Sequence, residues 1–417
     1  MKKVKYGYKM TELGEIPIEW EIKKLKELGK SLIGLTYSPD DLVDEGNGTL
    51  VLRSSNIRDN RIVFDDNKYV NKDIQEKLIV KENDILICSR NGSKDLIGKC
   101  ALIDKKAEGS SFGAFMTIYR SKYNKYLFNV FASYMFKRQI YNNLGATINQ
   151  ITTDNLNNFK VILPTIKEQE KIASILSTVD EQIDNIDELI QKNKELKKGL
   201  MQQLLTKGIG HTKFKKTEIG EIPEEWEVKK ISELCNIVSG GTPSTKEYSY
   251  WDNGEILWAT PTDITSNGKY ISDTFSRITE EGLKNSSANM LPIGSILMSS
   301  RATIGERCIN KVPMCTNQGF KSFICKENLH NEYMYYLIEI IKNDFISLSS
   351  GSTFLELSKS AIERFNIAVP GIGEQKEIAS ILSEVDEKIE EYENKKQKLE
   401  ELKKGLMQQL LTGKIRV

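Results

Sequence analysis

One ten-residue string occurs twice in this chain, and it constrains the fold more than any other feature. The letters KKGLMQQLLT occupy 197–206 and return at 403–412, an offset of 206 residues. The same offset separates Pro164 from Pro370. A repeat of this kind indicates a tandem duplication, so the second half of the chain is expected to repeat the fold of the first.

Each copy of the string lies in a stretch with helical periodicity. Apolar residues recur at alternating steps of four and three along 172–204 and 378–410. A mean step of 3.5 residues keeps one stripe turned toward a partner helix, as in a coiled coil. Thr165 and Glu168 have the spacing of an N-terminal capping box, and a glycine follows each stretch. Each half is therefore predicted to carry one helix of roughly 40 residues, about 60 Å long.

The two predicted helices most simply pack on each other. An antiparallel pair would place the two intervening domains at opposite ends of a rod. The predicted coiled-coil interface consists of Ile172, Leu176, Val179, Ile183, Ile186, Leu200 and Leu204 in the first helix and Ile378, Leu382, Val385, Ile389, Leu399, Leu406 and Leu410 in the second.

Polar residues interrupt this stripe at Asn193, Lys197, Lys396 and Lys403. One interpretation is local fraying, or lysine stems that lie along the seam with their charges in water. The other is that these positions fix the register and orientation of the helices at some cost in stability. The sequence leaves both interpretations open.

Length and composition bound the class of protein. A chain of 417 residues with 39% hydrophobic and 28% charged residues is typical of an ordinary protein with two or three domains. No apolar run reaches membrane-spanning length and the first residues lack a signal peptide, so a cytoplasmic location is expected. The net charge is +1, and the two helical segments together carry −3, which leaves +4 elsewhere. Any nucleic-acid surface must therefore be local and lie outside the helices.

The six cysteines are not arranged as a metal site. None forms a Cys-x-x-Cys pair, and the chain has only two histidines. We expect reduced, half-buried cysteines that act as small hydrophobic residues, and no bound metal or cofactor.

Each half also contains a predicted α+β domain. Residues 11–28 and 217–234 are nearly identical opening motifs in which a turn, a short strand and a helix follow one another. About 140 residues of short strands and turns come next, and strands that alternate with helices indicate a compact α+β domain. Strands are predicted near 49–52, 61–64, 84–88, 100–103 and 115–119 with a helix near 126–141, and in the second half near 254–258, 295–299, 306–309 and 320–325 with a helix near 332–345.

The two halves diverge between these shared frames. Residues 235–262 have no close counterpart in 29–60, which indicates two modules of one architecture with different targets. The predicted organisation is a first α+β domain, a helical spacer, a linker with a second α+β domain, and a second helical spacer, at 1–163, 164–206, 207–369 and 370–417.

No catalytic set can be assembled from the sequence. Gly-x-Gly-x-x-Gly and Walker loops do not occur, and no carboxylate pair recurs in a plausible frame. The glycine-rich segment 239–242 is interpreted as a turn. The chain is therefore not expected to be an enzyme.

The loops that follow the strands hold candidate DNA contacts. Arg90 and Arg301 each follow a serine at the end of an apolar strand. Arginine there can reach O6 and N7 of guanine, asparagine or glutamine can do the same for adenine, and lysine or hydroxyl side chains suit phosphates. The candidates are Arg53, Ser54, Asn56, Arg58, Arg90, Asn91 and Lys94 in the first domain and Thr242, Arg301, Thr303, Asn317, Gln318 and Lys321 in the second.

Several motifs occur together: the opening GEIPxEW, ILMSSRATIG at 296–305, TNQG at 316–319, and the helix starts Glu168-Gln169 and Glu374-Gln375 followed by IASIL. Over essentially its whole length the chain resembles the DNA-specificity subunit of type I restriction-modification systems. The resemblance implies two domains that each read one half of a split double-stranded DNA target, held apart by two antiparallel helices. One departure is the loop 89–98, which is longer than the corresponding segment after Ser299.

The resemblance also implies partners. The helices would dock methyltransferase subunits, one per half, and translocase-nuclease subunits would join that core. S-adenosylmethionine, ATP and magnesium would belong to those partners.

Two alternatives fit part of the pattern. A specificity subunit of a related bipartite system, with a fused methyltransferase-nuclease partner, would have nearly the same sequence. A coiled-coil adaptor would explain the helices but not two diverged α+β domains.

Overall fold

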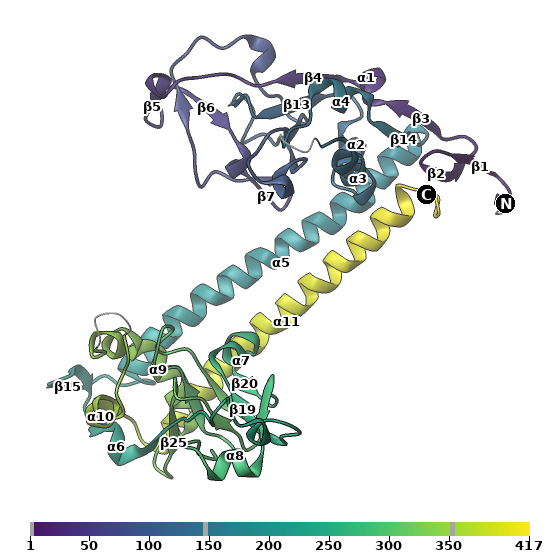
Figure 1. The fold of residues 1–417 in the computed structure, drawn as a ribbon. Helices are drawn as coiled ribbons and strands as arrows, with labels where there is room; N and C mark the ends of the chain where they lie inside the picture. The colour runs from purple at the N-terminus through teal and green to yellow at the C-terminus, as the bar shows by residue number, and fades with distance from the viewer. Residues whose placement is uncertain (1–3, 145–148, 351–354) are drawn as a thin grey trace. The chain divides into compact units, whose positions relative to one another are not determined.

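The computed structural model describes three ranges of the chain, 4–144, 149–350 and 355–417. The chain divides into two compact units, residues 1–187 with 394–417 and residues 188–393 (Figure 1). Each unit holds one α+β domain and one half of each long helix. The predicted boundaries lie at the ends of the long helices, whereas the compact units divide within these helices, after 187 and after 393. The two divisions differ because each part of a long helix packs on the domain of its own unit.

Each unit opens on a two-stranded hairpin. In the first unit β1 (Tyr8–Thr11) pairs antiparallel with β2 (Gly14–Pro17), and Gly14 at the turn has a φ of 111°. β3 (Glu21–Lys24) then runs into α1 (Leu25–Leu28), as the sequence predicts. The corresponding elements of the second unit are β15 (Phe214–Thr217), β16 (Gly220–Pro223), β17 (Glu227–Lys230) and α6 (Ile231–Leu234).

A mixed or antiparallel sheet forms the centre of each domain. In the first unit the strand order is β11-β10-β13-β4, with bounds Cys100–Leu102, Ile85–Cys88, Met116–Arg120 and Lys30–Ile33. In the second unit the order is β18-β25-β22-β23-β20, with bounds Cys235–Ser239, Lys321–Cys325, Ile296–Met298, Arg307–Asn310 and Tyr270–Ile271. The predicted strands near 84–88, 100–103, 295–299, 306–309 and 320–325 are thus present.

A second, smaller sheet covers part of each domain, and it shows that the diverged segments are related. In the first unit its order is β12-β6-β9-β5, with bounds Ser111–Phe112, Thr49–Leu52, Tyr69–Val70 and Leu42–Val43. In the second unit its order is β21-β19-β24, with bounds Ser276–Ile278, Ile256–Ala259 and Cys315–Thr316. β6 pairs parallel with β12, and β19 pairs parallel with β24. The segments 29–60 and 235–262 therefore share a topology that their sequences do not reveal.

A helical turn follows each of these parallel strands. In the first unit Arg53 N donates to Asn56 Oδ1 (3.0 Å). In the second unit Thr260 N donates to Asp263 Oδ2 (2.7 Å) at the start of α7 (Pro261–Ser266). Asn56 and Asp263 are both buried. The amide of Asn56 and the carboxylate of Asp263 thus cap equivalent helical turns in the two units.

The remaining short strands form two-stranded pairs in both units. β7 (Ile57–Arg58) pairs with β8 (Arg61–Ile62), so the strand predicted near 61–64 is only two residues long. β14 (Lys160–Leu163) pairs with β3, and β26 (Asn366–Val369) pairs with β17 in the second unit. The strand that enters each domain therefore lies beside the strand that leaves it.

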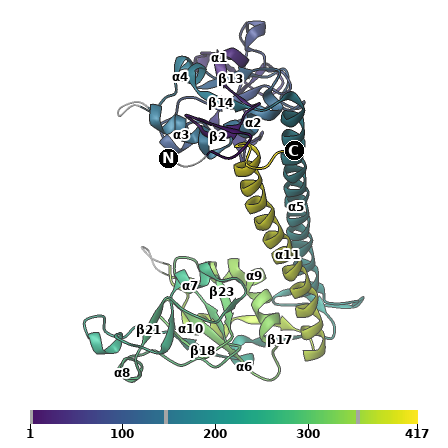
Figure 2. The ribbon, with the colours of Figure 1, turned by 90° about the vertical axis from the view of Figure 1, so that its right-hand side faces the viewer.

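The helix predicted near 126–141 is instead two helices. α2 (Asn124–Phe131) ends before Ser133, whose Oγ accepts a hydrogen bond from Phe136 N (3.4 Å) and begins α3 (Tyr134–Asn143). The prediction was wrong because a serine side chain serves here as a helix cap. The second unit has one helix at this place, α9 (Asn331–Ser347), and Figure 2 shows it beside the α11 segment of the same unit. The other short helices are α4 (Thr153–Asn158), α8 (Glu280–Lys284) and α10 (Lys359–Arg364).

The two long helices are α5 (Ile166–Lys207) and α11 (Ile372–Leu410), of 42 and 39 residues. Within each unit their segments run antiparallel. In the first unit Asp180 pairs with Lys403 and Asp187 pairs with Lys396, so the contacts go back along α11 as they advance along α5. Most of the predicted interface residues are buried, whereas Leu200, Leu399 and Leu406 are partly exposed.

The polar residues of the seam are used in pairs. The ammonium groups of Lys403, Lys396 and Lys197 each lie 2.6 Å from an aspartate oxygen on the facing helix. Asn193 instead donates to the carbonyl of Leu189 on its own helix. The pairs Lys403–Asp180 and Lys197–Asp386 occupy equivalent positions of the repeat. These half-buried ion pairs favour the register interpretation for the lysines.

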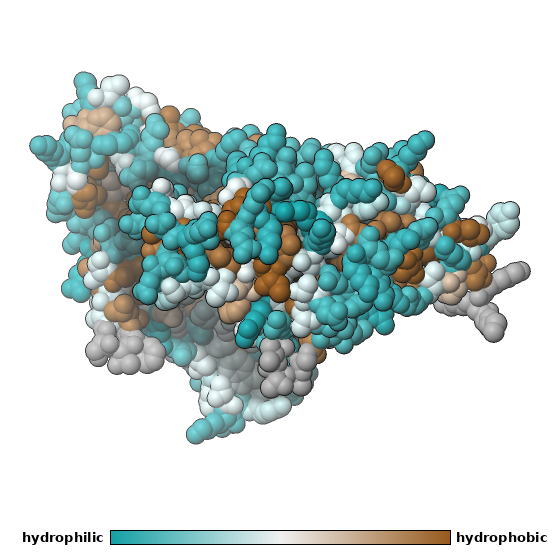
Figure 3. Space-filling view, turned by 90° about the horizontal axis from the view of Figure 1, so that it is seen from above, coloured by the Kyte–Doolittle hydropathy of each residue, from teal (hydrophilic) through white to brown (hydrophobic). Residues whose placement is uncertain are grey.

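Within the three described ranges, no helix is long and apolar enough to cross a bilayer. Figure 3 shows hydrophilic residues over most of the face that it presents, with apolar patches scattered between them. Scattered apolar residues are normal for a protein surface.

A carboxylate joins the opening motif to the long helix in each unit, and in the first unit it is buried. Glu168 accepts hydrogen bonds from Trp20 Nε1 (2.9 Å), Thr165 Oγ1 (2.8 Å) and Arg416 Nε (2.9 Å). Glu168 N also donates to Thr165 Oγ1, so Thr165 caps the helix as predicted. The Glu168 side chain binds the indole of the fully buried Trp20, whereas a capping box would direct it to the backbone.

The second unit repeats this closure with different donors. Glu374 Oε2 accepts from Trp226 Nε1 (3.1 Å), and Glu374 Oε1 accepts from Ile209 N (2.9 Å). His211 Nε2 lies 3.0 Å from the same oxygen. Both Trp–Glu pairs therefore tie the start of a domain to the start of the helix that leaves it.

We predict that Glu168→Gln lowers the free energy of unfolding at pH 7 by about 1.5–3 kcal/mol, the range for hydrogen bonds to a charged group. Burial acts to raise the pKa of Glu168, but the hydrogen bonds from Arg416, Thr165 and Trp20 outweigh it and hold the pKa below its usual range. The stabilisation is therefore present above the unfolded pKa and is lost as pH falls through the folded pKa. Denaturant unfolding at pH 7 and pH 3 measures both effects.

Glu170→Gln on the exposed side of the same helix turn is the matched control, and it should change stability by less than about 0.5 kcal/mol. An equal loss in both variants would contradict the role given to Glu168.

Candidate nucleic-acid interface

Three loops that carry candidate residues meet in the second unit at one end of the strands of the five-stranded sheet. The strand ends form this edge of the sheet. β18 and β22 end at this edge and β25 begins there, because β25 runs antiparallel to both. The loops after β18 and β22 carry Thr242 and Arg301, and the turn before β25 carries Asn317 and Gln318. Thr242 Oγ1 donates to the Gln318 side chain, and Asn317 Oδ1 accepts from Gly319 N (2.9 Å). The structure thus brings these four candidates together.

The glycine-rich segment after β18 is a packed turn. A Cβ at Gly240 would overlap the carbonyl oxygen of Asn317, and one at Gly241 would overlap the backbone of Ser287 and Ala288. Only glycine permits such close approach of two backbones. The interpretation as a turn agrees with this packing.

Arg301 is held by a carboxylate from a distant part of the chain, Glu356. Its Nη2 lies 2.9 Å from Glu356 Oε2, and both side chains are partly exposed. Lys321 Nζ lies 3.4 Å from the other oxygen of Glu356, and the Lys321 side chain is only 9% exposed. Burial acts to raise the pKa of Glu356, but the two cations outweigh it and lower the pKa. Arg301 and the exposed Thr303 can face a ligand, whereas Lys321 is buried and is not placed to bind a phosphate.

The first unit has an equivalent edge, where β10 ends and β13 begins. Ser89 N and Arg90 N both donate to the carbonyl of Phe115 (3.0 Å each), and Ser89 Oγ donates to the same oxygen. The exposed Arg90 guanidinium lies 5.1 Å from the centre of the Phe115 ring. Phe115 itself is 59% exposed. An arginine and an aromatic ring are therefore presented together on a fixed backbone.

The loop after Arg90 places two further candidates next to it. Asn91 Nδ2 donates to Ser54 Oγ (3.3 Å), and Asn91 Oδ1 accepts from Ser93 N (3.0 Å). Lys94 is exposed on the helical turn that follows. Ser54, Arg90 and Asn91 thus lie together, as the predicted interface requires.

The candidates between 53 and 58 have mixed surroundings. Arg53 Nη2 binds Asp66 Oδ2 (2.8 Å), and Arg58 Nη2 binds Asp65 Oδ2 (2.7 Å) at an exposed site. Asn56 is fully buried, and its amide also donates to the carbonyl of Val63 (3.1 Å). Its side chain closes the loop, so it is not placed to read a base.

Sequence reasoning missed Phe115 and Glu356. Phe115 was assigned to a strand, and its exposure depends on the loop that anchors its carbonyl. Glu356 lies 55 residues after Arg301 in the chain, with no spacing rule that connects the two. Contacts of this kind arise from tertiary structure and leave no local pattern.

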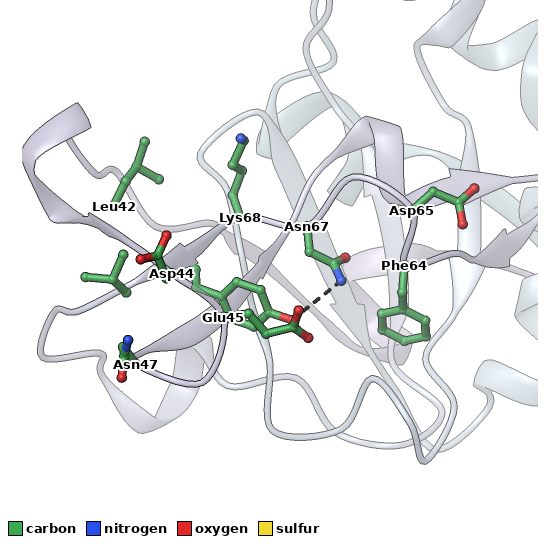
Figure 4. Close-up of a pocket in the computed structure, with 10 residues that line it drawn as sticks. Leu42, Asp44, Glu45, Asn47, Phe64, Asp65, Asn67 and Lys68 are labelled. Atoms are coloured by element: carbon green, nitrogen blue, oxygen red, sulfur yellow. Dashed lines mark hydrogen bonds between the residues drawn. The ribbon is translucent and has the colours of Figure 1, made fainter.

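A hollow of about 770 Å³ in the first unit is lined mainly by acidic side chains where it carries charge (Figure 4). Asp44, Glu45 and Asp65 line it together with Lys68, and the hydroxyl of Tyr69 donates to Glu45 Oε1 (2.9 Å). Asp65 is paired with Arg58, so Asp44 and Glu45 against Lys68 leave a net negative charge that disfavours a phosphate backbone. This hollow therefore does not extend the candidate DNA surface.

Two of the cysteines, Cys235 and Cys325, lie opposite each other on β18 and β25, with their sulfurs 3.8 Å apart. All six are free, and every one except Cys325 is buried. Burial raises the pKa of Cys88 to about 11 and that of Cys100 to about 12, so both are neutral thiols at pH 7. Within the part of the chain that the structure describes, no three His, Cys, Asp or Glu side chains gather as metal ligands.

Comparison with known proteins decides the family. The model of the type I restriction modification DNA specificity domain matches residues 17–198 and again residues 223–401. The chain belongs to this family. The two matches are the two halves of the duplication, so the family fold accounts for both α+β domains and for most of both long helices.

Two relatives from Methanocaldococcus jannaschii agree with this membership. The MjaVIII type I restriction enzyme specificity subunit is 30% identical over 420 residues, which cover 96% of this chain and 94% of that protein. The MjaIX specificity subunit is 43% identical over 196 residues, 46% of this chain and 44% of that protein. Among solved structures, the S subunit of the type I system from M. genitalium is similar in fold, with a TM-score of 0.57 at 15% identity over 94% of this chain and 96% of that one.

We predict that Glu356→Gln lowers the free energy of unfolding by about 1–3 kcal/mol, because the buried Lys321 ammonium loses its counter-charge. Thermal and denaturant unfolding of the full chain measure the change.

Glu363→Gln is the control. Its partner is the surface residue Lys359, 3.6 Å away on the same helix, and such pairs contribute less than about 0.5 kcal/mol. Equal stability of the Glu356→Gln and Glu363→Gln variants would show that Lys321 does not depend on Glu356.

Proposed function

We propose that this chain is the DNA-specificity subunit of a type I restriction-modification complex, in which each α+β domain reads one half of a split target. The observation that carries the proposal is a repeated geometry. Arg90 follows β10 and Arg301 follows β22, which are equivalent strands, and each arginine is exposed at the same edge of its sheet. The loops around the two arginines differ, so the two edges would prefer different bases.

Base contacts would come from the major groove. Arg90 and Arg301 can each place two donors on O6 and N7 of guanine, and Asn91 or Gln318 can bind adenine. The hydroxyl and lysine candidates would hold phosphates and fix the position of the domain. The proposed surface consists of Arg53, Ser54, Arg58, Arg90, Asn91 and Lys94 in residues 1–163, and of Thr242, Arg301, Thr303, Asn317 and Gln318 in residues 207–369.

The helical spacers 164–206 and 370–417 would dock the partner subunits. Leu196 and Leu402 are equivalent residues of the repeat, and they are 52% and 50% exposed. The glutamines 202–203 and 408–409 are also exposed and also identical in both copies. The middle of the helices has diverged, so identity at exposed positions is not a general property of the repeat. Leu196 with Gln202 and Gln203 forms one exposed strip, and Leu402 with Gln408 and Gln409 forms the other. A second copy of the same partner explains why both strips are the same.

We infer that this partner is the methyltransferase subunit, one copy on each strip, and that translocase-nuclease subunits join the assembly. S-adenosylmethionine, ATP and magnesium would be bound by these partners. The specificity chain would supply target choice and contribute no catalytic residue.

We predict that Arg301→Ala relaxes base choice in one half of the target only, at a cost of about 1–3 kcal/mol for a lost bidentate contact. Arg90→Ala should do the same in the other half. The measurement is single-molecule methylation mapping in a host that carries each variant together with its methyltransferase. Weaker methylation of all sequences alike would identify the arginine as a phosphate contact.

We predict that Leu196→Glu or Leu402→Glu each removes one methyltransferase copy from the complex, because a carboxylate would be buried in an apolar contact. Native mass spectrometry of the complex should show a loss from two copies to one.

Leu189→Glu is the matched control, since Leu189 is also exposed on α5 but the equivalent position of the repeat is a lysine, Lys395. Retention of both copies in the Leu196 and Leu402 variants would place the partner elsewhere.

A further inference from the structure

A buried lysine lies where the second recognition domain meets the long helices of its own unit. Lys269 directly precedes β20, the edge strand of the five-stranded sheet, and its side chain is only 11% exposed. Its ammonium donates to Ser383 Oγ (2.7 Å), Glu332 Oε2 (3.0 Å) and Tyr336 OH (3.2 Å). An ammonium has three donors, so every one of them is used.

Aromatic rings surround the same charge. The Lys269 nitrogen lies 4.7 Å from the ring centre of Tyr336, 5.2 Å from that of Tyr270 and 5.8 Å from that of Tyr335. Tyrosine faces attract a cation at these distances. Lys269 therefore occupies a site with one favourable position for its head group.

The contacts continue from this lysine into both long helices. Glu332 and Tyr336 belong to α9, and Ser383 belongs to α11. Tyr336 OH donates to Asp386 Oδ2 on α11 (2.7 Å), and Asp386 Oδ1 binds Lys197 Nζ on α5 (2.6 Å). These side chains are the Lys269 cluster: Lys197, Lys269, Glu332, Tyr336, Ser383 and Asp386. It connects the start of the edge strand β20, helix α9 and both long helices within one compact unit.

The cluster is better suited to fixing a geometry than to adding stability. Burial lowers the pKa of Lys269, although Glu332 and Asp386 act to raise it, so the contacts do not fully offset the loss of water. Apolar residues can stabilise such a contact at least as well as buried ion pairs. A hydrogen-bonded charge network, however, is satisfied in a single arrangement only, whereas an apolar contact tolerates sliding.

The first unit attaches its domain differently. Arg61 on β8 pairs with Asp184 on α5, and its Nη2 lies 3.5 Å from the carbonyl of Asp180. The side chains of Arg61 and Asp184 are 37% and 45% exposed. An exposed pair of this kind holds its geometry weakly, because water and salt compete for both charges.

We propose that the Lys269 cluster sets the angle at which the second recognition domain stands on its helix segments, and thereby the spacer length that the complex accepts between the two half-sites. The proposal rests on the proposed function as a reader of split targets. Lys269 is a positioning residue: it is buried at the helix contact, and its ammonium binds Ser383, Glu332 and Tyr336, none of which is a candidate DNA contact. A change of angle would move that edge along the DNA without altering which bases it prefers.

The test measures spacer preference separately from base preference. The full chain is purified with its methyltransferase partner, and the target is taken from methylation mapping of the wild type. Methylation is then measured on three duplexes that differ only in a spacer of native length, one base pair shorter or one base pair longer. Lys269→Met removes the charge and keeps the stem, and Tyr336→Phe removes only the hydroxyl that joins Lys269 to Asp386.

We expect both variants to reduce the preference for the native spacer by about tenfold while the preferred bases of both half-sites stay the same, a change equal to ~1.4 kcal/mol. Arg61→Met is the matched control and should change that preference by less than about twofold, since its ion pair is exposed. If Lys269→Met does not fold, Tyr336→Phe alone decides the test.

Other results would overturn the inference. An equal fall in methylation on all three duplexes would make the cluster merely structural, and so would an unchanged preference in Tyr336→Phe. An equally large change of spacer preference in Arg61→Met and Lys269→Met would show that the Lys269 cluster has no greater effect on spacer choice than an exposed ion pair. If the wild type methylates no split target at all, the proposed function itself fails, and this outcome is distinct from the others.

Discussion

Each long helix begins at a carboxylate that is buried in the first unit and partly buried in the second, and the organisation of both units depends on that contact. Glu168 and Glu374 each accept a hydrogen bond from the indole of a fully buried tryptophan that opens the domain. A carboxylate can be buried only if its lone pairs are occupied, so the domain and the helix must form together. Because the helix start is fixed to the domain in this way, the loops at the sheet edge are presented from a rigid base.

The local features of this fold were predictable from sequence, whereas the long-range contacts were not. Periodicity indicated α5 and α11 to within a few residues, and the repeated opening motif predicted β3 and α1 because their signals are local. The helical break at Ser133 was missed because serine is compatible with both a helix surface and a cap. The shared topology of 29–60 and 235–262 was hidden because Asn56 and Asp263 perform one capping task with different side chains.

The candidate site divides in the same way. The exposed arginines at 90 and 301 were recognisable because each follows a serine at the end of an apolar strand. Their partners, Phe115 and Glu356, come from distant parts of the chain, and so do Glu332 and Ser383 around Lys269. A single sequence contains no record of such pairs. Residue type and strand position therefore predicted which side chains to consider, but not which of them are free.

Several basic residues near the proposed DNA surface already hold a carboxylate. Arg301 binds Glu356, Arg53 binds Asp66 and Arg58 binds Asp65. A DNA phosphate or base competes with that carboxylate for the guanidinium, so binding to an arbitrary sequence gains less from these cations. A correct base can repay the exchange with two well-aligned hydrogen bonds. Internal acids can thus favour discrimination over affinity.

The pairing of the strands that enter and leave each domain has an evolutionary consequence. In the first unit β3 lies beside β14, with Ile22 opposite Ile162, and in the second β17 lies beside β26 in the same manner. Everything between these strands departs from and returns to one point on the protein. Such a segment can be exchanged for another of different length with little disturbance of the frame that receives it. Recombination at two short, nearly repeated sequences would then yield a chain with a new target and an unchanged scaffold.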